Sequence, residues 1–270
     1  MKWNYRKKTA LVTGASSGIG EVFAHELAKK GCNLILVART QERLEQLARV
    51  LEEMYTINAV VIPMDLGRFD AAGRIAQEVS NLGLSVDILI NNAGFGTLGR
   101  FNDIPQSRLI QEIQLNIGSL TELTHLFIGG MCERKDGVIV SVASMTAFQP
   151  TPFMAVYGAT KAYILSFTEA LWAEYRESGV RIVALCPGET KSSFHAVSGT
   201  ECLNSKRMEP IEVVNAAFDA VEKDRSSRIV GINNNVMALL SRFLPRRVII
   251  NVTKNIFQPA LENKQISADQ

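Results

Sequence analysis

The sequence predicts an α/β fold built on a doubly wound parallel sheet with helices on both faces. Apolar and β-branched runs alternate with amphipathic helical runs as far as about residue 230. The short runs are apolar at nearly every position, as expected of parallel strands buried on both faces. The chain has 270 residues, a 47% hydrophobic composition and no linker rich in Pro, Gly or Ser, which suits one large core.

Seven short runs are expected to form the strands. Their order along the chain is 10–13, 33–38, 59–64, 87–91, 138–142, 181–185 and 228–230. Parallel strands end at the same edge of a sheet, and ligands of such sheets bind beyond that edge. The longest break, 190–207, precedes a helix expected over 211–221. Its polar composition favours a mobile lid over the site, and an inert surface excursion is the alternative.

The tail is expected to form an amphipathic helical extension, 231–270, beyond the domain that contains the predicted sheet, 1–230. Apolar residues recur at helical spacing over 236–244 and again after Pro245. Four cations among them suit a helix pair lying on an anionic membrane surface through 236–257; these are Arg242, Arg246, Arg247 and Lys254. The alternative is that the helices close a substrate pocket or pack on a partner subunit. The charges and Pro245 argue against a membrane-spanning helix.

The composition excludes several classes of function. A formal net charge of +2, with no long basic block before the tail, gives no reason to expect a nucleic-acid partner. The basic N-terminus leads into a short strand without a cleavable apolar run, so no secretory signal is expected. The cysteines and histidines lie far apart in the sequence, which favours reduced thiols in a cytoplasmic setting and no metal site; they are Cys32, Cys132, Cys186, Cys202, His25, His125 and His195.

A glycine-rich turn follows the first strand and opens a helix. Its residues are Gly14, Ser16, Ser17, Gly18, Ile19 and Gly20. Glycines let the backbone approach phosphates closely, and the N–H groups at the start of a helix attract negative charge. The spacing differs from the G-x-G-x-x-G pattern, but its place between strand and helix predicts a site for a dinucleotide pyrophosphate.

Three further motifs occur at strand ends. Asn92, Ala93 and Gly94 follow the fourth strand, Ser144 follows the fifth, and the helix after it begins with Tyr157-Gly-Ala-Thr-Lys161. Together with the glycine-rich turn they resemble the short-chain dehydrogenase/reductase family over residues 8–230. The resemblance implies a Rossmann-type sheet and hydride transfer between a nicotinamide cofactor and a carbonyl or alcohol. It also implies a homodimer or homotetramer formed through helices that begin near Ser107 and Ala155.

Tyr157 and Lys161 are four residues apart, so they lie on one face of a helix. A free tyrosine has a pKa of about 10, and a neighbouring ammonium would favour its phenolate. The resemblance makes Tyr157 the general acid/base and gives Lys161 a second role at the nicotinamide ribose. It makes Ser144 the residue that polarises the carbonyl; Ser141 competes but falls inside a strand. Asn116 resembles the asparagine that bends a helix and holds a water leading to the lysine.

The choice of cofactor depends on the end of the second strand. An acidic residue there would bind the ribose of NAD, whereas an arginine would bind the extra phosphate of NADP. Ala38 offers no carboxylate and Arg39 offers a planar guanidinium, so NADP(H) is expected unless Arg39 is a plain surface residue.

The remaining cofactor contacts are implied by the resemblance. Asp65 would meet the adenine, although a turn cap is its alternative role. Pro187 and Gly188 would lie against the nicotinamide. Thr190 and Ser192 are both candidates for the hydroxyl that meets the carboxamide or the phosphates.

Aromatic and methionine side chains flank the motifs and suggest an apolar or bulky small-molecule carbonyl substrate; they are Phe95, Met145, Phe148 and Phe153. The function expected is an NADP(H)-dependent oxidoreductase that interconverts a carbonyl and an alcohol. A non-catalytic NADP(H)-binding scaffold or redox sensor, held at a membrane by its tail, is the alternative from another class. Within the enzymes, the same tyrosine chemistry could serve an epimerisation or dehydration.

Overall fold

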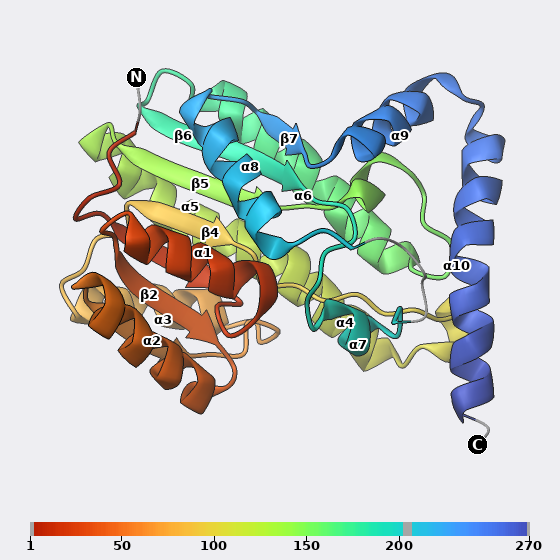
Figure 1. Ribbon diagram of the computed structural model, residues 1–270, viewed down its shortest axis with the longest axis horizontal. Helices are drawn as coiled ribbons and strands as arrows, with labels where there is room; N and C mark the ends of the chain where they lie inside the picture. The colour runs from red at the N-terminus through yellow and green to blue at the C-terminus, as the bar shows by residue number, and fades with distance from the viewer. Residues whose placement is uncertain (1–2, 202–206, 269–270) are drawn as a thin grey trace.

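The computed structural model describes residues 3–201 and 207–268, and within it a seven-stranded parallel sheet carries the fold (Figure 1). The strands are β1 (Thr9–Thr13), β2 (Asn33–Ala38), β3 (Ala59–Pro63), β4 (Ile88–Asn91), β5 (Gly137–Val142), β6 (Val180–Cys186) and β7 (Ser227–Ile229). All seven predicted strands are present, and their ends differ from the prediction by one residue at most. Their order across the sheet is β3-β2-β1-β4-β5-β6-β7, so the direction of winding reverses between β1 and β4.

Helices cover both faces of the sheet, which confirms the doubly wound prediction (Figure 1). One face carries α1 (Gly18–Lys29), α2 (Gln41–Tyr55) and α8 (Pro210–Glu222). The other carries α3 (Ala71–Asn81), α5 (Ser119–Arg134) and α6 (Ala155–Glu174). The shorter elements are η1 (Phe101–Asp103), α4 (Gln106–Ile113), η2 (Gln114–Gly118), η3 (Met145–Phe148) and α7 (Phe194–Ser198).

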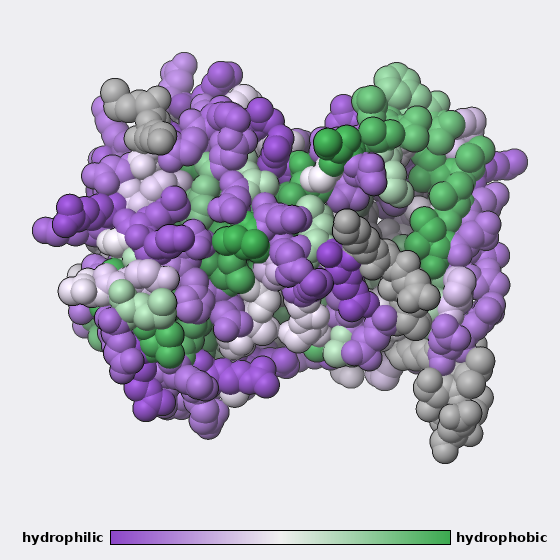
Figure 2. Space-filling view, in the orientation of Figure 1, coloured by the Kyte–Doolittle hydropathy of each residue, from purple (hydrophilic) through white to green (hydrophobic). Residues whose placement is uncertain are grey.

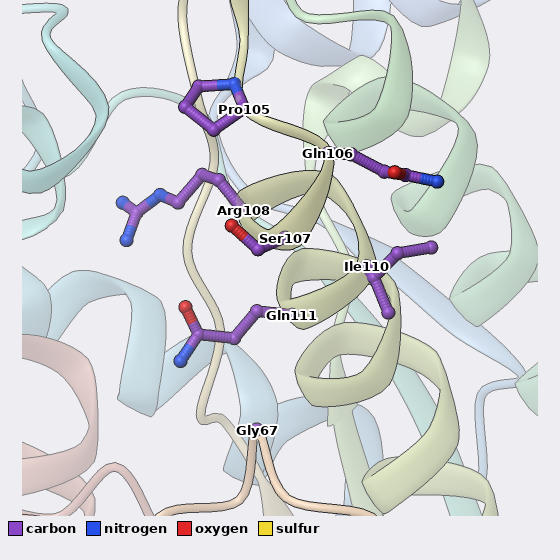
Figure 3. Close-up of a pocket in the computed structure, with 7 residues that line it drawn as sticks. All are labelled: Gly67, Pro105, Gln106, Ser107, Arg108, Ile110 and Gln111. Carbon is purple, nitrogen blue, oxygen red and sulfur yellow. The ribbon is translucent and has the colours of Figure 1, made fainter.

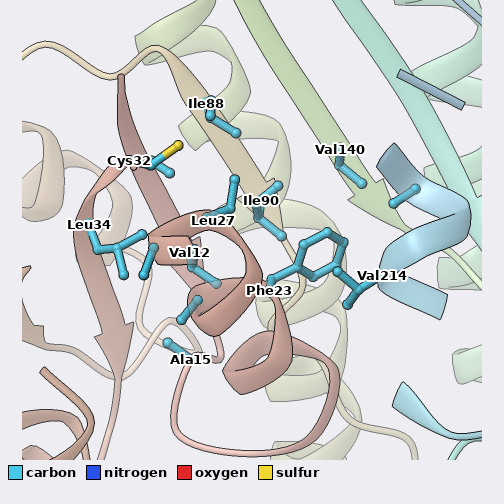
Figure 4. Packing of buried hydrophobic residues seen from close by; sticks show 14 of the residues in the cluster. Val12, Ala15, Phe23, Leu27, Cys32, Leu34, Ile88, Ile90, Val140 and Val214 are labelled. Carbon is cyan, nitrogen blue, oxygen red and sulfur yellow. The ribbon is translucent and has the colours of Figure 1, made fainter. Parts of the chain in front are cut away.

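The core under α1 shows why the sheet is buried. Phe23 and Leu27 lie one turn apart on α1 and pack against Ile90 of the sheet and Val214 of α8 (Figure 4). These side chains are almost completely buried. Burying a large apolar side chain contributes about 1.5–3 kcal/mol to the stability of the folded state. Because helices cover both faces of the central strands, neither face of these strands needs polar side chains.

The extension forms two helices, as the apolar spacing predicts. They are α9 (Ile232–Phe243) and α10 (Arg246–Ala268), separated at Leu244 and Pro245. The α10 helix stands at the end of the molecule beside the carboxyl edge of the sheet (Figure 1). No described helix is long and apolar enough to cross a membrane. The division into a domain and an extension at residue 230 stays a prediction.

Candidate active site

The glycine-rich turn lies between the end of β1 and the start of α1. Gly14 and Gly18 have φ values of 66° and 60°, in the left-handed region that favours glycine. A Cβ on Gly20 would overlap the Gly14 carbonyl oxygen, and one on Gly14 would lie 2.8 Å from Nδ2 of Asn92. The turn therefore accepts only glycine at these positions. Ser17 is the N-cap residue and makes no side-chain capping bond, so the first N–H groups of α1 stay open to a phosphate.

The segment after β4 is joined to this turn by hydrogen bonds. The Thr13 hydroxyl accepts from the backbone N–H groups of Asn92 and Ala93, at 2.9 and 3.0 Å. Nδ2 of Asn92 donates to the Thr13 carbonyl oxygen at 2.9 Å. The two strands at which the winding reverses thus form one rigid floor. Open sheets of this kind bind dinucleotides at such a reversal point, which is where the motif predicts one.

The position of Arg39 agrees with the cofactor argument. It follows β2 directly and is exposed, close to the turn, because Ala15 donates to the Val37 carbonyl oxygen at 3.2 Å. None of the described residues forms an ion pair with Arg39. Oδ1 of Asp65 accepts from the N–H of Gly67 at 3.0 Å, which is the turn-capping role named as its alternative. An adenine contact by Asp65 stays a prediction.

Asn116 lies in a single π-helical turn, η2, where α4 passes into α5. It is almost completely buried. Its Nδ2 donates to the Phe95 carbonyl oxygen at 2.9 Å and to Oγ1 of Thr160 at 3.0 Å, while its Oδ1 accepts from the Phe95 N–H at 3.2 Å. Such turns often mark functional positions in helices. The irregular turn therefore falls at the asparagine that the sequence singled out, and a bend of the helix there stays a prediction.

Tyr157, Lys161 and Ser144 come together at the carboxyl edge of the sheet. Nζ of Lys161 lies 5.7 Å from the centroid of the Tyr157 ring and donates to the Val142 carbonyl oxygen at 2.7 Å. The Ser144 hydroxyl lies near enough to hydrogen-bond Tyr157. Ser144 begins η3 just beyond β5, whereas Ser141 is buried inside the strand. The structure therefore brings together the four residues predicted to be catalytic and keeps Ser141 apart.

The electrostatics of Tyr157 differ from the sequence argument. Burial raises the pKa of Tyr157 above its ordinary value; the Ser144 hydrogen bond opposes this shift, and the Glu112 carboxylate adds to it. Burial also lowers the pKa of Lys161 to about 8, while Cys186 and Glu112 oppose that change. Lys161 is not among the causes of the Tyr157 shift, so the expectation that its ammonium favours the phenolate stays a prediction. Tyr157 keeps its proton at neutral pH because burial disfavours its charged form.

The segment predicted as a lid is partly folded onto the site. Its base is fixed where Met208 pairs with Thr190, and α7 packs Phe194 against Tyr157 with ring centroids 5.2 Å apart. The buried His195 joins this segment together, with Nε2 3.1 Å from the Thr190 carbonyl oxygen. Residues 202–206 of the predicted lid, with Cys202, lie outside the described residues. Opening of the segment stays a prediction.

The candidate nicotinamide residues lie just before this segment and at its start. The Pro187 carbonyl oxygen accepts from the Met145 N–H at 3.0 Å, which fixes the loop beside Ser144. Oγ1 of Thr190 donates to the Gly188 carbonyl oxygen at 3.0 Å, and Oγ of Ser192 donates to the Thr190 carbonyl oxygen at 3.5 Å. A Cβ on Gly18 would lie 2.8 Å from Cβ of Ser192. Ser192 is therefore nearer the glycine-rich turn, and either hydroxyl stays a candidate.

An apolar cluster surrounds the Tyr157 ring, and α10 is part of it. Its other buried members are Leu98, Met154 and Ala260, with Phe153, Phe194 and Phe257 packed around them. A Cβ on Gly96 would lie 2.9 Å from the Tyr157 ring, so glycine makes room for it. Of the four side chains predicted to line the pocket, only Phe153 belongs to this cluster. Phe148 packs against Leu120, Ala143 and Ile164 instead, and Phe95 lies under the Arg108 guanidinium at 4.0 Å.

Glu112 is a site residue that the sequence reasoning missed. It is completely buried on α4, and neither carboxylate oxygen has a hydrogen-bond partner among the described residues. Burial raises its pKa to about 7, although the nearby Thr97 hydroxyl, Arg108 and Lys161 act in the opposite direction. The signal was present in the sequence: residues 109, 112 and 116 share one helical face, so the glutamate falls at a core position.

Two surface depressions lie near the site, and the second borders the Tyr157 cluster at Phe153. One lies over the outer side of α4, with Gly67 facing Gln111 across it (Figure 3). The other, of about 200 Å³, lies beside Phe153 and is also lined by Thr97 and Leu109. Neither is lined by Tyr157 or Lys161, which agrees with the burial of both side chains.

The family model described as short chain dehydrogenase matches residues 8–202. The chain belongs to this family. Hydroxysteroid dehydrogenase-like protein 1 of Gallus gallus is 38% identical over 183 residues, which are 66% of this chain and 54% of that protein. The chain thus spans about half the length of this relative. The three cysteines in the described part are free, and no cluster of metal-binding side chains occurs there.

Solved structures of the family resemble this fold. A short-chain dehydrogenase from Sphingobium yanoikuyae in complex with NADPH is 30% identical, with a TM-score of 0.80 and coverage of 87% of this chain and 93% of that one. The bulky-bulky ketone specific alcohol dehydrogenase from Comamonas testosteroni is 30% identical, with a TM-score of 0.75 and coverage of 87% and 92%. A family member from Burkholderia phymatum in complex with NAD, 21% identical with a TM-score of 0.79 over 88% and 94%, shows likeness of fold alone.

Proposed function

We propose that this chain is an NADPH-dependent reductase of bulky, apolar ketones, or an alcohol dehydrogenase in the reverse direction. The observation that carries the proposal is Tyr157, which lies buried in an apolar cluster beside Ser144 and Lys161 at the carboxyl edge of the sheet. A non-catalytic scaffold would need neither this set of groups nor an apolar enclosure around the phenol. The alcohol dehydrogenase from Comamonas testosteroni, specific for bulky-bulky ketones, supports the substrate class.

Each catalytic side chain has a task that follows from its position. When bound, NADPH supplies the hydride to the carbonyl carbon. The Ser144 hydroxyl donates a hydrogen bond to the carbonyl oxygen, and Tyr157 donates its proton to that oxygen as negative charge develops on it. Because its raised pKa keeps Tyr157 protonated, it is ready as an acid in the direction of reduction. Lys161 stabilises the phenolate left behind and, with Arg39 and the glycine-rich turn, would hold the cofactor.

Asn116 positions the lysine rather than contacting the substrate. It bonds Phe95 and Thr160, and the Thr160 hydroxyl in turn donates to the Tyr157 carbonyl oxygen at 2.8 Å. A Cβ on Gly94 would lie 2.9 Å from Oδ1 of Asn116 and 3.6 Å from Nζ of Lys161. The two side chains therefore meet across a space that only glycine leaves open.

The test is cofactor oxidation by the purified chain, followed separately with NADPH and NADH. Substrates are a panel of aryl and cyclic ketones, aldehydes and 3-keto esters. We expect turnover with NADPH, highest for the bulkiest apolar ketones because the cluster around Tyr157 is apolar. NADPH binding without turnover of any substrate in the panel would favour the scaffold or sensor alternative. Failure to bind either cofactor would contradict the assignment altogether.

Arg39→Asp is expected to weaken the preference for NADPH over NADH. The substitution removes a planar, bidentate partner for the extra phosphate and places a like charge beside it. A hydrogen bond to a charged group contributes about 1.5–3 kcal/mol, so kcat/KM for NADPH should fall by roughly 10- to 100-fold while that for NADH does not fall. Arg49→Asp, which changes an exposed arginine of α2, is the matched control. An equal loss with both cofactors would contradict the role of Arg39.

We propose that copies of the chain associate through α4, α5 and α6. These helices expose apolar side chains outside the Tyr157 cluster, namely Ile110, Ile113, Leu126 and Tyr163. Tyr163 links two of the helices, since its hydroxyl lies 2.9 Å from that of Thr121. An apolar face of this kind suits a homodimer or homotetramer.

A further inference from the structure

The elbow formed by residues 232–256, which comprise α9 and the first part of α10, exposes an unusually apolar surface. Ala238 is the only buried residue of α9. Ile232 is 84% exposed and Phe243 77%, and the same surface continues along α10 (Figure 2). Its other exposed apolar members are Val236, Met237, Leu239, Leu240, Leu244, Val248, Ile250, Val252 and Ile256. Soluble monomers rarely expose so continuous an apolar patch, and such patches mark sites that bind a partner or a membrane.

The charge on the elbow identifies the kind of occupant. Arg242, Arg246, Arg247 and Lys254 are all exposed, and no described residue forms an ion pair with any of them. The sequence has no acidic residue between Asp224 and Glu262. Apolar side chains interspersed with unpaired cations are the composition of helices that lie in the interface of an anionic bilayer.

We propose that the elbow docks on an anionic lipid bilayer and lies in its interface. The contact proposed is peripheral, with both helices lying along the surface. A second copy of the chain fits less well, because a two-fold contact through this surface would oppose arginines with arginines and offer them no carboxylate. An anionic lipid surface supplies negative headgroups for the cations and acyl chains for the apolar residues.

The docking surface is continuous with the wall of the candidate active site. Oγ1 of Thr253 donates to the Pro150 carbonyl oxygen at 3.0 Å, which fixes α10 to the segment before α6. One turn further on, Phe257 and Ala260 pack in the cluster around Tyr157. The same helix thus faces the bilayer at one end and encloses the phenol at the other. If the proposed reductase function holds, an apolar ketone dissolved in the bilayer would reach Tyr157 beside α10.

The test is co-sedimentation of the purified full chain with vesicles, and it requires no activity. Vesicles of phosphatidylcholine alone are compared with vesicles that also contain phosphatidylserine, at low and at high salt. We expect stronger binding to the anionic vesicles and a loss of that difference at high salt, because salt screens exposed charges. Equal binding to both kinds of vesicle, or no binding to the anionic kind at low salt, would overturn the proposal.

Substitutions at the elbow separate its charges from its apolar residues. Arg246→Glu with Arg247→Glu should weaken binding to anionic vesicles by roughly 30-fold or more, since each basic residue near such a surface contributes about fivefold. Phe243→Ser should weaken binding to both kinds of vesicle by roughly 10-fold. The matched control is Arg43→Glu with Arg49→Glu, which reverses two exposed charges on α2 and should leave binding unchanged.

Oligomeric state, measured by sedimentation of the same proteins without vesicles, decides between a bilayer and a second copy. We expect the mass of the Arg246→Glu, Arg247→Glu variant to equal that of the unaltered chain. A lower mass for this variant, together with unchanged vesicle binding, would assign the elbow to subunit contact and refute the bilayer proposal. Because none of these measurements uses turnover, a failure of the proposed function would leave their outcome unaffected.

Discussion

Tyr157→Phe is expected to lower kcat for ketone reduction by about 10²–10⁴-fold. The Kd for NADPH should stay within twofold of its original value, a change of at most about 0.4 kcal/mol in binding free energy. The substitution removes the phenolic proton that the proposed mechanism transfers to the carbonyl oxygen. The ring itself remains, with its centroid 5.2 Å from that of Phe194, and it keeps its place beside Gly96. Kinetics and a cofactor titration on the same preparation measure the two effects separately.

Tyr163→Phe is the matched control for this experiment. Tyr163 lies in the same helix, α6, and also has one hydroxyl contact, to Thr121, but it faces outwards. Removing the Tyr163 hydroxyl should change turnover by less than twofold, because this hydroxyl is remote from Lys161 and Ser144. Activity in Tyr157→Phe comparable to that of Tyr163→Phe would show that another group, or water, supplies the proton. The reductase mechanism proposed above would then be wrong.

The sheet could be predicted closely because one physical signal dominates it. Parallel strands buried on both faces must be apolar at successive positions, as in β5 and β6, whereas the helices between them show a period near 3.6. The glycine-rich turn could also be predicted, because its backbone leaves no room for a Cβ at Gly14 or Gly20. Local sequence therefore sufficed wherever local geometry determines the residue type.

The predictions failed where distant segments meet. Nothing near Tyr157 in the sequence shows that Phe257 and Ala260, a hundred residues away, enclose its ring. The sequence argument considered the ammonium of Lys161 but not this enclosure, and so it did not anticipate that burial raises the pKa of Tyr157. Phe148 was assigned to the pocket because of its neighbours in sequence, yet it packs between α5 and α6. Burial is a property of the whole fold, and it decides both the electrostatics and the lining of the site.

Glu112→Gln is expected to stabilise the protein above pH 7 and to have little effect at pH 4.5. The folded state raises the pKa of Glu112 from 4.5 to about 7, so the folded chain holds a proton that the unfolded chain releases between these values. Stability from this group is therefore fully present below pH 4.5 and is lost as the pH rises through 7. A pKa shift of this size corresponds to about 3 kcal/mol of folding stability. Glutamine is uncharged at every pH, so the variant does not lose this stability as the pH rises.

Thermal unfolding measured across this pH range tests the prediction. The Tm of Glu112→Gln should match that of the unaltered chain near pH 4.5 and exceed it by roughly 6–12 °C above pH 7. Glu53→Gln, at an exposed position of α2, should show no such dependence. A difference in Tm that stays the same from pH 4.5 to pH 8 would mean that Glu112 does not titrate in this range.

The same substitution connects the stability of the fold to the chemistry of the site. Ionised Glu112 raises the pKa of both Tyr157 and Lys161, so its replacement should lower both. The alkaline limb of the pH–rate profile for reduction should therefore move to lower pH in Glu112→Gln, because Lys161 would lose its charge below the value of about 8 that it has beside the glutamate. A pH–rate profile that does not move would mean that Glu112 affects the stability of the fold but not the pKa values that govern the reaction.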